Sequence, residues 1–481
     1  MAEASSPRNV LDSLFHPQSV AVIGVMPGAD ENRFGGQYYI RSIIDIGYKG
    51  RLYAVGIKSG EYRGLHIYPK VTDIPDPIEY AIIAVPARIV PKILADCGDK
   101  GIHAVHIFSA GFSELSGETG KKLQEEIIEI ARRQGIRFIG PNCMGVYSPA
   151  GGLTFNGKFT TQSGTLSFIS QSGSNAEYTI RMGMRRGVYF AKVVSYGNGP
   201  DIAETDLLEY LAGDTETKAI ALYIEGIQDG KRFFKVLRNA AQAKPVMVLK
   251  GGSSEIGRNA ALSHTGSVTG SAAVWSAAVK QAGAVEVKDL DEFLDLALLF
   301  NNMAPPRGRN SAIIGIGGGF GVFVSDTWSA AGLSANCFPP EISDKVRNLF
   351  ESETGASYRN PVELFGWTAL NSLPVVIGIL ADAEQINNIM IHLPVGFVNA
   401  VMPKVLISAA DGLASLPAEI KRRLIVALHA AFTPEDAAIM VKLEKILAEA
   451  GLPVFPSAPR AANALNKFIS YHEHFRVLPI R

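Results

Sequence analysis

The regular alternation of short apolar runs with helical patterns restricts the fold of this chain more than any other feature. In the first third, five β-branched runs are separated by amphipathic stretches: residues 19–24, 51–55, 80–85, 104–108 and 137–140. Strands that alternate with helices in this way pair in parallel through right-handed crossovers. We therefore predict an α/β protein that begins with a doubly wound, Rossmann-like domain and binds its ligand at the carboxyl ends of the strands.

The pattern starts again after a turn-rich stretch, residues 141–164. Further strands are expected at residues 165–170, 192–195, 218–224 and 245–250, and a helix at 291–300. The sequence APPRG at 304–308 has the composition of a linker. These features predict three domains, at residues 1–150, 151–304 and 305–481, and the last two are expected to be flavodoxin-like with parallel sheets.

The second and third domains look like repeats of each other. Residues 165–187 and 311–332 both read as a strand, a turn of small residues, a helix and a glycine. The strand before Glu225 has a counterpart at 389–395, where nothing acidic follows. We therefore place the chemistry in the first copy and expect the second to be a scaffold or a docking surface for another subunit.

Charge and cysteine content narrow the classes of partner. The 481 residues carry 46 Lys and Arg against 46 Asp and Glu, so no chain-wide basic field attracts nucleic acid or an anionic membrane. Three cysteines are too few for a disulfide framework or a Cys-rich metal site. No signal pattern opens the chain and no apolar run reaches the length of a membrane span, so a cytoplasmic protein without a metal site is expected.

Several common nucleotide and hydrolase motifs are missing. The chain has no GxxxxGK[ST] sequence for a Walker-type ATP site and no GxSxG nucleophile elbow. The glycine-rich loop at 24–36 follows the first strand, but its spacing is not GxGxxG, which disfavours a nicotinamide enzyme. Such a loop can bring backbone N–H groups to a phosphate, or it can be a turn without a ligand.

Two turns carry groups suited to phosphate chemistry. SQSGS at 170–174 follows a strand and opens a helix, so it presents hydroxyls and backbone donors to an anion, although similar turns also serve as plain caps. His264 lies in SHTGS, within a loop of small residues that leaves its ring accessible. A neutral imidazole can attack phosphorus when its other nitrogen donates to a carboxylate, and Glu225 is the candidate for that carboxylate. A single histidine is more often structural or on the surface.

The other reactive side chains are weaker candidates. Cys143 is expected to be a buried small hydrophobe rather than a nucleophile. His103 and His106 would lie on opposite faces of a strand, so a shared metal is not expected. His472 and His474 have no ligand partners at suitable spacing and are expected to be exposed.

Several motifs, taken in order, resemble the NDP-forming acyl-CoA synthetases, the superfamily that contains succinyl-CoA synthetase and the ADP-forming acetyl-CoA synthetases. The match is to the α part. Residues 14–24, 73–87, 106–114 and 139–149 are similar to its CoA-binding domain, and residues 164–174, 195–202, 222–230 and 257–271 to its ligase domain. The third domain continues the resemblance at 359–364 and 451–465.

The resemblance implies an acid–CoA ligase that converts an acid, CoA and ATP into acyl-CoA, ADP and phosphate, through an acyl phosphate and a phosphohistidine. It places the phosphoryl group on His264, with Glu225 holding the phosphohistidine. The phosphate would be bound by Ser170, Ser172, Gly173 and Ser174, and CoA by Gly24, Gly28, Lys58, Val85, Pro86, Ala87 and Asn142. The chain departs from the family in one loop, where Val55-Gly56-Ile57-Lys58 replaces the frequent Asn-Pro-Lys.

The chain as given leaves no room for the ATP-grasp domains of this family. A separate ATP-grasp β subunit is therefore expected to bind ATP or ADP with Mg²⁺, in an α2β2-like assembly, and the substrate is expected to be a small carboxylic acid. Two alternatives remain open at this point: a non-catalytic protein that binds CoA or acyl-CoA, and an acyl-CoA transferase that works without a nucleotide.

Overall fold

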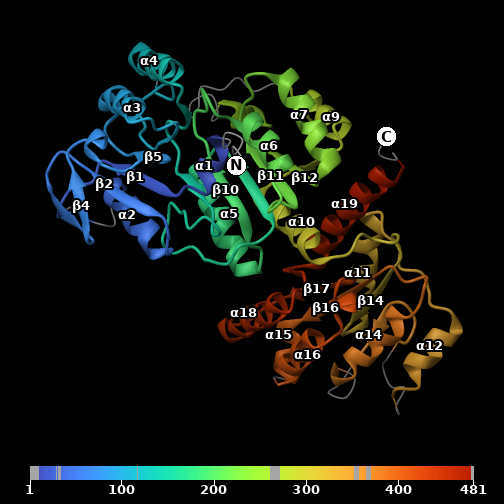
Figure 1. Cartoon of the computed structure of the whole chain (residues 1–481). Helices are drawn as coiled ribbons and strands as arrows, with labels where there is room; N and C mark the ends of the chain where they lie inside the picture. The colour runs from blue at the N-terminus through green and yellow to red at the C-terminus, as the bar shows by residue number, and fades with distance from the viewer. Residues whose placement is uncertain are drawn as a thin grey trace, which may run out of the picture. The chain divides into compact units, whose positions relative to one another are not determined.

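The chain divides into two compact units. In the computed structural model, residues 10–28, 30, 34–115, 117–259, 271–350, 357–364, 370–402 and 404–477 are described. One unit comprises Met1–Met184 and Tyr189–Leu290, and the other comprises Arg185–Val188 and Asp291–Arg481. The first contains two sheets and the second contains one (Figure 1). These three largely parallel sheets confirm the predicted α/β fold.

The first sheet has seven strands in the order β3-β4-β2-β1-β5-β6-β7. Neighbouring strands are parallel, except for β3 and β4. Helix α2 lies on one side of the sheet, and α3 and α4 lie on the other (Figure 1). The strands are β1 Ser19–Ile23, β2 Arg51–Val55, β3 Gly60–Tyr62, β4 Leu65–Tyr68, β5 Tyr80–Ile83, β6 Ala104–Ile107 and β7 Arg137–Ile139; the helices are α1 Val10–Phe15, α2 Gly36–Asp45, α3 Val90–Asp99 and α4 Glu118–Gln134, with single turns η1 Val71–Asp73 and η2 Ala87–Ile89.

Helices cover both faces of the first sheet, which explains why its central strands are apolar in sequence. Every residue of β1, β5 and β6 is buried, as expected when helices pack on both sides of a parallel sheet. The β3–β4 hairpin was not predicted. Its two-residue turn, Arg63-Gly64, has positive φ at both positions (49° and 80°), which is the geometry of a type I′ turn, but it lacks the usual Asn-Gly sequence.

The second sheet has six strands in the order β13-β12-β11-β9-β10-β8. Helices α6, α7 and α9 lie on one side and α5 on the other (Figure 1). The strands are β8 Gly145–Tyr147, β9 Leu166–Ser170, β10 Phe190–Ser195, β11 Ala219–Ile224, β12 Val246–Lys250 and β13 Val285–Val287; the helices are α5 Gly173–Arg186, α6 Glu204–Gly213, α7 Gly230–Ala243 and α9 Ala272–Gln281. Strand β8 falls within the stretch expected to consist of turns; it lies at the edge of the sheet and pairs antiparallel with β10.

The third sheet repeats this topology in the second unit. Its order, β15-β14-β16-β17-β18, matches β10-β9-β11-β12-β13 strand for strand, and all of its pairs are parallel. The predicted internal repeat is therefore confirmed. The strands are β14 Ser311–Gly315, β15 Val362–Glu363, β16 Asn388–Pro394, β17 Leu424–His429 and β18 Val454–Phe455.

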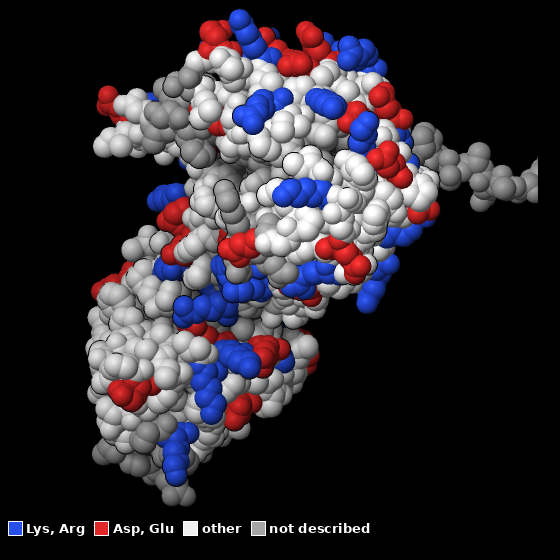
Figure 2. Space-filling view, turned by 90° about the vertical axis from the view of Figure 1, so that its left-hand side faces the viewer, with Lys and Arg blue, Asp and Glu red and all other residues white. Residues whose placement is uncertain are grey.

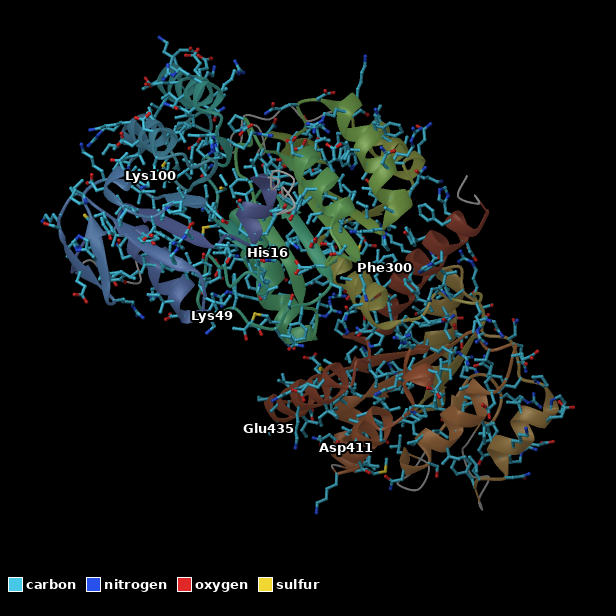
Figure 3. All side chains as sticks on the ribbon, viewed as in Figure 1. His16, Lys49, Lys100, Phe300, Asp411 and Glu435 are labelled. Atoms are coloured by element: carbon cyan, nitrogen blue, oxygen red, sulfur yellow. The ribbon has the colours of Figure 1, made fainter. Side chains whose placement is uncertain are left out.

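The described helices of the second unit pack in two groups around this sheet. Helix α11 contacts α19, whereas α16 contacts both α14 and α18. Phe300 of α10 packs against Phe468 and Tyr471 of α19, with 5.2 Å between ring centroids in each pair, and Figure 3 labels its position. The helices are α10 Leu290–Asn302, α11 Gly318–Ala330, α12 Pro340–Arg347, α14 Leu373–Ala381, α15 Val395–Val401, α16 Val405–Ala414, α17 Ala418–Lys421, α18 Pro434–Glu449 and α19 Ala458–Val477.

Charges of both signs are mixed on the visible surface. On the face that Figure 2 shows, Lys and Arg side chains are interspersed with Asp and Glu, in keeping with their equal numbers in the sequence. Among the helices that the structure describes, none combines the length and the apolar character needed to cross a membrane.

Candidate functional site

Two polar turns meet at the carboxyl edge of the second sheet. Strands β9 and β11 are adjacent and parallel, with Ser170 beside Tyr223. The sequence after β9 is Gln171-Ser172-Gly173, and the sequence after β11 is Glu225-Gly226. The helix that follows β9 and the helix that follows β11 cover opposite faces of the sheet, so the chain opens a crevice between the two strands. This is where ligands bind in doubly wound sheets.

The turn after β9 exposes the start of a long helix. Helix α5 begins at Gly173, and the Ser172 hydroxyl accepts a hydrogen bond from the backbone N–H of Asn175 at 3.3 Å. The Ser174 hydroxyl lies 3.2 Å from that of Ser172. The first backbone N–H groups of a helix have no partners within it, and the helix dipole favours an anion there. Ser172, Gly173 and Ser174 therefore form a surface suited to phosphate.

Ser170 has a different position within this turn. Its side chain is completely buried, and its hydroxyl donates to the Ser172 carbonyl at 2.6 Å and accepts from the Ser172 N–H at 3.2 Å. These bonds fix the shape of the turn. In this conformation, Ser170 supports the groups that would face phosphate.

Gly173 is required where the two domains of the first unit meet. A Cβ atom on this residue would lie 2.5 Å from Cγ of Met144. The Met144 N–H in turn donates to the Ser195 hydroxyl at 3.3 Å. A side chain at position 173 would therefore displace Met144 from the helix start.

Glu225 is held in place from several sides. Its side chain is 5% exposed, and one carboxylate oxygen accepts a hydrogen bond from the Tyr223 hydroxyl at 3.1 Å. The Gln171 side-chain oxygen accepts from the backbone N–H groups of Glu225 at 2.8 Å and Gly226 at 3.2 Å. Burial, followed by the charge of Glu225, raises the pKa of Tyr223, so this hydroxyl keeps its proton and remains a donor. Gln171 thus joins the two turns.

Lys250, like Gln171, is a residue of this site that the sequence analysis did not single out. It ends β12, and its ammonium group donates to the backbone carbonyls of Glu225, at 2.6 Å, and Gly251. Burial lowers the pKa of Lys250, and the nearby charge of Glu225 opposes that shift. The lysine could have been noticed because it stands at the carboxyl end of a strand next to the one that leads to Glu225.

His264 lies outside the described residues, as do all of residues 260–270. On either side of that stretch, Asn259 is described, and Ser271 precedes α9. The role of His264 therefore stays a prediction from the sequence.

The residues expected to bind CoA gather at the carboxyl edge of the first sheet. Gly24 follows β1, Lys58 lies between β2 and β3, and residues 85–87 (Val85, Pro86 and Ala87) follow β5. Gly24 has a φ of 106°, and a Cβ atom there would lie 2.2 Å from the Ala84 carbonyl oxygen. Gly28 has a φ of 71° and no described atom within 4 Å of an added Cβ, and Lys58 is exposed. This close-packed backbone edge fits the pyrophosphate of a nucleotide-like cofactor.

Asn142 sits between the first and second sheets, which belong to the same unit. It has a φ of 60°, its N–H donates to the Ser109 carbonyl at 2.9 Å, and its side-chain amide donates to Asn198 at 3.4 Å. The Asn198 amide donates to Glu114 at 2.7 Å. Asn142 thus lies on a polar path from the first sheet to the loop that follows β10.

The weaker candidates have structural positions. Cys143 is buried, as predicted, and burial raises its pKa. His106 is buried with a pKa lowered to about 4, mainly by burial, whereas His103 is exposed and bonds the Gly135 carbonyl. His474 is exposed, but the prediction for His472 was wrong: it is half-buried, with its ring 4.7 Å from that of Phe468. The described residues contain no cluster of three metal-binding side chains.

Two family descriptions match the part of the chain between residues 18 and 300. Residues 18–149 match a CoA binding domain, and residues 163–300 match a succinyl-CoA ligase-like flavodoxin domain. The first match contains the whole first sheet, and the second contains the strands of the second sheet except β8.

Named relatives and a solved structure match nearly the whole chain. The α subunit of the ADP-forming acetate–CoA ligase I of Pyrococcus furiosus is 36% identical over 463 residues, covering 95% of this chain and 96% of that protein. The ADP-forming 4-hydroxybutyrate–CoA ligase of Nitrosopumilus maritimus is 30% identical over 97% of this chain, which spans 65% of that longer protein. A structure of acetyl-coenzyme A synthetase 1 from Ca. Korarchaeum cryptofilum, in complex with phosphate and ADP, has a TM-score of 0.85 and 27% identity, and the match covers 98% of this chain and 99% of that one.

Proposed function

The chain belongs to the family of ADP-forming acyl-CoA ligases, and we propose that it is the α subunit that carries the phosphohistidine step of the reaction. In the ligase direction, a carboxylic acid, CoA and ATP are converted into acyl-CoA, ADP and phosphate. The relatives are named for different acids, acetate and 4-hydroxybutyrate. Members of this family are therefore named for more than one acid.

One contact supports this proposal more than any other. The Gln171 side chain accepts hydrogen bonds from the backbone of Glu225 and Gly226, so it ties the strand end that carries the carboxylate to the start of α5. A phosphoryl group on an imidazole needs donors for its oxygens and an acceptor for the second ring nitrogen. Ser172, Gly173 and Ser174 supply the donors, and Glu225 supplies the acceptor.

The proposed chemistry proceeds through two transfers at this edge. A carboxylate oxygen of the acid attacks phosphorus on the His264 ring, the P–N bond breaks, and an acyl phosphate forms. The CoA sulfur, after losing its proton, then attacks the acyl carbon, the C–O bond breaks, and phosphate leaves. Two covalent stages replace one difficult condensation: Glu225 stabilises the imidazole that leaves in the first, and the donors at residues 172–174 hold the phosphoryl oxygens in both.

The first sheet is proposed to hold CoA, whose thiol is the nucleophile of the second transfer. Gly24, Gly28, Lys58, Asn142 and residues 85–87 lie along the edge suited to its phosphates. ATP or ADP with Mg²⁺ is proposed to bind to a separate ATP-grasp β subunit, in an α2β2-like assembly in the cytoplasm. The limits 1–150, 151–304 and 305–481 are our proposal for the CoA, ligase and interface domains.

Reconstitution with a partner tests the proposed function. The purified chain alone should form no acyl-CoA from ATP, CoA and acetate, and activity should appear when a separately purified ATP-grasp subunit is added. Full ATP-dependent synthesis by the single chain would contradict the subunit assignment. CoA binding without turnover in the complete mixture would favour a CoA-binding protein, and acyl transfer without nucleotide would favour a transferase.

A further inference from the structure

An apolar pocket of about 470 Å³ lies beside the proposed catalytic edge. It is formed between α7 and α9 and reaches the ends of β11 and β12. Its apolar wall includes Ile227, Phe233, Phe234, Val274 and Trp275. Gly226 also lines the pocket and directly follows Glu225, so the pocket opens next to the residue proposed to hold the phosphohistidine.

We propose that this pocket binds the hydrocarbon part of the carboxylic acid, and that the acid carries an aromatic ring or a branched chain rather than a single methyl group. The inference rests on the proposed function, and it specifies the substrate class of the same site. The occupant is identified by three properties of the pocket: its apolar wall, its single charged group and its size.

The wall is suited to a flat or branched hydrocarbon. The rings of Phe233 and Trp275 are stacked, with centroids 5.9 Å apart and planes inclined by 17°. Val274, which also lines the pocket, is 68% exposed at the start of α9. Apolar side chains at an accessible site favour a ligand that removes their surface from water.

Lys250 is the only charged residue among those lining the described part of the pocket. Its ammonium group lies 5.9 Å from the centroid of the Trp275 ring. Two of its three donors are directed to the carbonyls of Glu225 and Gly251. A third donor remains for an anion, which sets the orientation of an apolar acid: the carboxylate at Lys250, beside Glu225, and the hydrocarbon between the helices.

The volume argues for a substrate larger than acetate. A cavity of about 150 Å³ is enough to hold a benzene ring, and this pocket has about three times that volume. The methyl group of acetate would leave most of the wall in contact with water. An arylalkanoic acid would cover it.

A partial reaction of the single chain tests this proposal directly. Acyl-CoA and phosphate should form acyl phosphate and release CoA, and the acyl phosphate should then phosphorylate His264 and release the acid. The rate of CoA thiol release is measured with 3-phenylpropionyl-CoA and with acetyl-CoA. In the single chain the phosphoryl group on His264 has no acceptor, so each chain reacts once and kcat/KM denotes the second-order rate constant of that single turnover. For wild type, we expect it to be at least about tenfold higher with the aryl thioester, because filling an apolar pocket is worth about that factor for each small group.

The substitution Trp275→Ala should lower kcat/KM for the aryl thioester by about tenfold or more and change that for acetyl-CoA by less than about twofold. If removing Trp275 unfolds the chain, Ala278→Leu gives a second test, since Ala278 lines the pocket and a larger side chain would fill it; the same selective loss is expected. Val441→Ala, which truncates an exposed residue of α18, is the matched control and should affect neither substrate.

The outcomes separate this inference from the proposed function. If neither thioester releases CoA, the proposed function fails. If acetyl-CoA reacts but the aryl thioester does not, or if folded Trp275→Ala and Ala278→Leu change both rates equally or neither, the pocket proposal is wrong and the proposed function stands.

Discussion

The second and third sheets have the same strand order but different chemistry at their carboxyl edges. In the second sheet, β11 ends before Glu225, and Gln171 reaches across to bond its backbone. In the third, the equivalent strand β16 runs directly into α15 at Pro394 and Val395. Topology is thus retained by the apolar strands, whereas the polar residues after the strands, on which the proposed function rests, differ between the two copies without loss of the fold.

The third sheet contains a polar residue that its surroundings do not satisfy. His392 of β16 is 1% exposed, and neither of its ring nitrogens has a hydrogen-bond partner among the residues that the structure describes. Its ring is 5.5 Å from that of His429, at the end of β17. Burial, with a smaller effect of His429, lowers the pKa of His392 to about 4. In the second sheet, by contrast, the buried Ser170 and Gln171 have hydrogen-bond partners.

The largest effect that would distinguish the two copies is expected from Glu225→Gln. The change keeps the size of the side chain but removes the charge that pairs with the phosphohistidine, so the initial rate of phosphorylation from acyl-CoA and labelled phosphate should fall at least about 100-fold. Glu435→Gln, in the first turn of α18 (labelled in Figure 3), is the control in the second unit and should retain the wild-type rate. A rate within about threefold of wild type for Glu225→Gln would remove the assigned role.

The substitution His392→Leu in the third sheet should change how the free energy of unfolding depends on pH. The folded pKa of about 4 lies below the unfolded value of 6.5, so the unfolded chain binds more protons between these values and the folded state loses stability as pH falls from 6.5 towards 4. The free energy of unfolding of the wild-type chain should fall between pH 7 and pH 4.5, and without this histidine the fall should be smaller by about 2 kcal/mol. Calorimetric unfolding at the two pH values measures it.

His106 provides the control for this measurement. It is buried in the first sheet, and its pKa is also lowered to about 4. Its contribution should therefore remain in the His392→Leu variant. An unchanged pH dependence in that variant would show that the pKa of His392 in the folded protein is close to its unfolded value.

Glycine substitutions at the two equivalent helix starts should have opposite effects. Gly173→Ala places a methyl group against Met144 at the start of α5, so it should lower the free energy of unfolding by about 1 kcal/mol and slow phosphorylation. Thermal unfolding and the labelling rate measure both effects. A variant as stable and as active as wild type would mean that Met144 moves away at no cost.

Gly319→Ala gives the smallest expected change and the reverse sign. No described atom lies within 4 Å of the added Cβ in the first turn of α11, and alanine restricts the unfolded chain, so stability should rise by about 0.5 kcal/mol. The phosphorylation rate should stay the same. A destabilised variant would show that this helix start is constrained like that of α5.

The strands could be predicted because both of their faces are covered. Runs such as residues 80–85 and 219–224 are apolar along their whole length, and the structure places β5 and β11 there. The short strands β3, β4 and β8 have three or four residues each, so their patterns are too brief to recognise. His472 was predicted to be exposed, but its ring contacts Phe300, which is distant in the sequence, and Phe468, which lies on the same helix. The local sequence pattern does not reveal these contacts.

The sequence predicted those residues of the candidate site that lie in local motifs, but not the contacts between them. SQSGS and Glu225 stand directly after apolar strands, which marks them in the sequence. The link between them depends on Gln171 contacting a backbone 54 residues away, and Lys250 reaches back to the carbonyl of Glu225. Such contacts follow from the order of the strands in the sheet, which local sequence patterns do not specify.

The most direct test of the account is to locate the phosphoryl group after reaction of the single chain with acyl-CoA and labelled phosphate. We predict one acid-labile, base-stable label per chain, which peptide mass spectrometry assigns to His264. The label should be absent from His264→Ala and strongly reduced in Glu225→Gln. A label that persists in His264→Ala, or one that maps to the second unit, would contradict the claim that the first copy carries the chemistry.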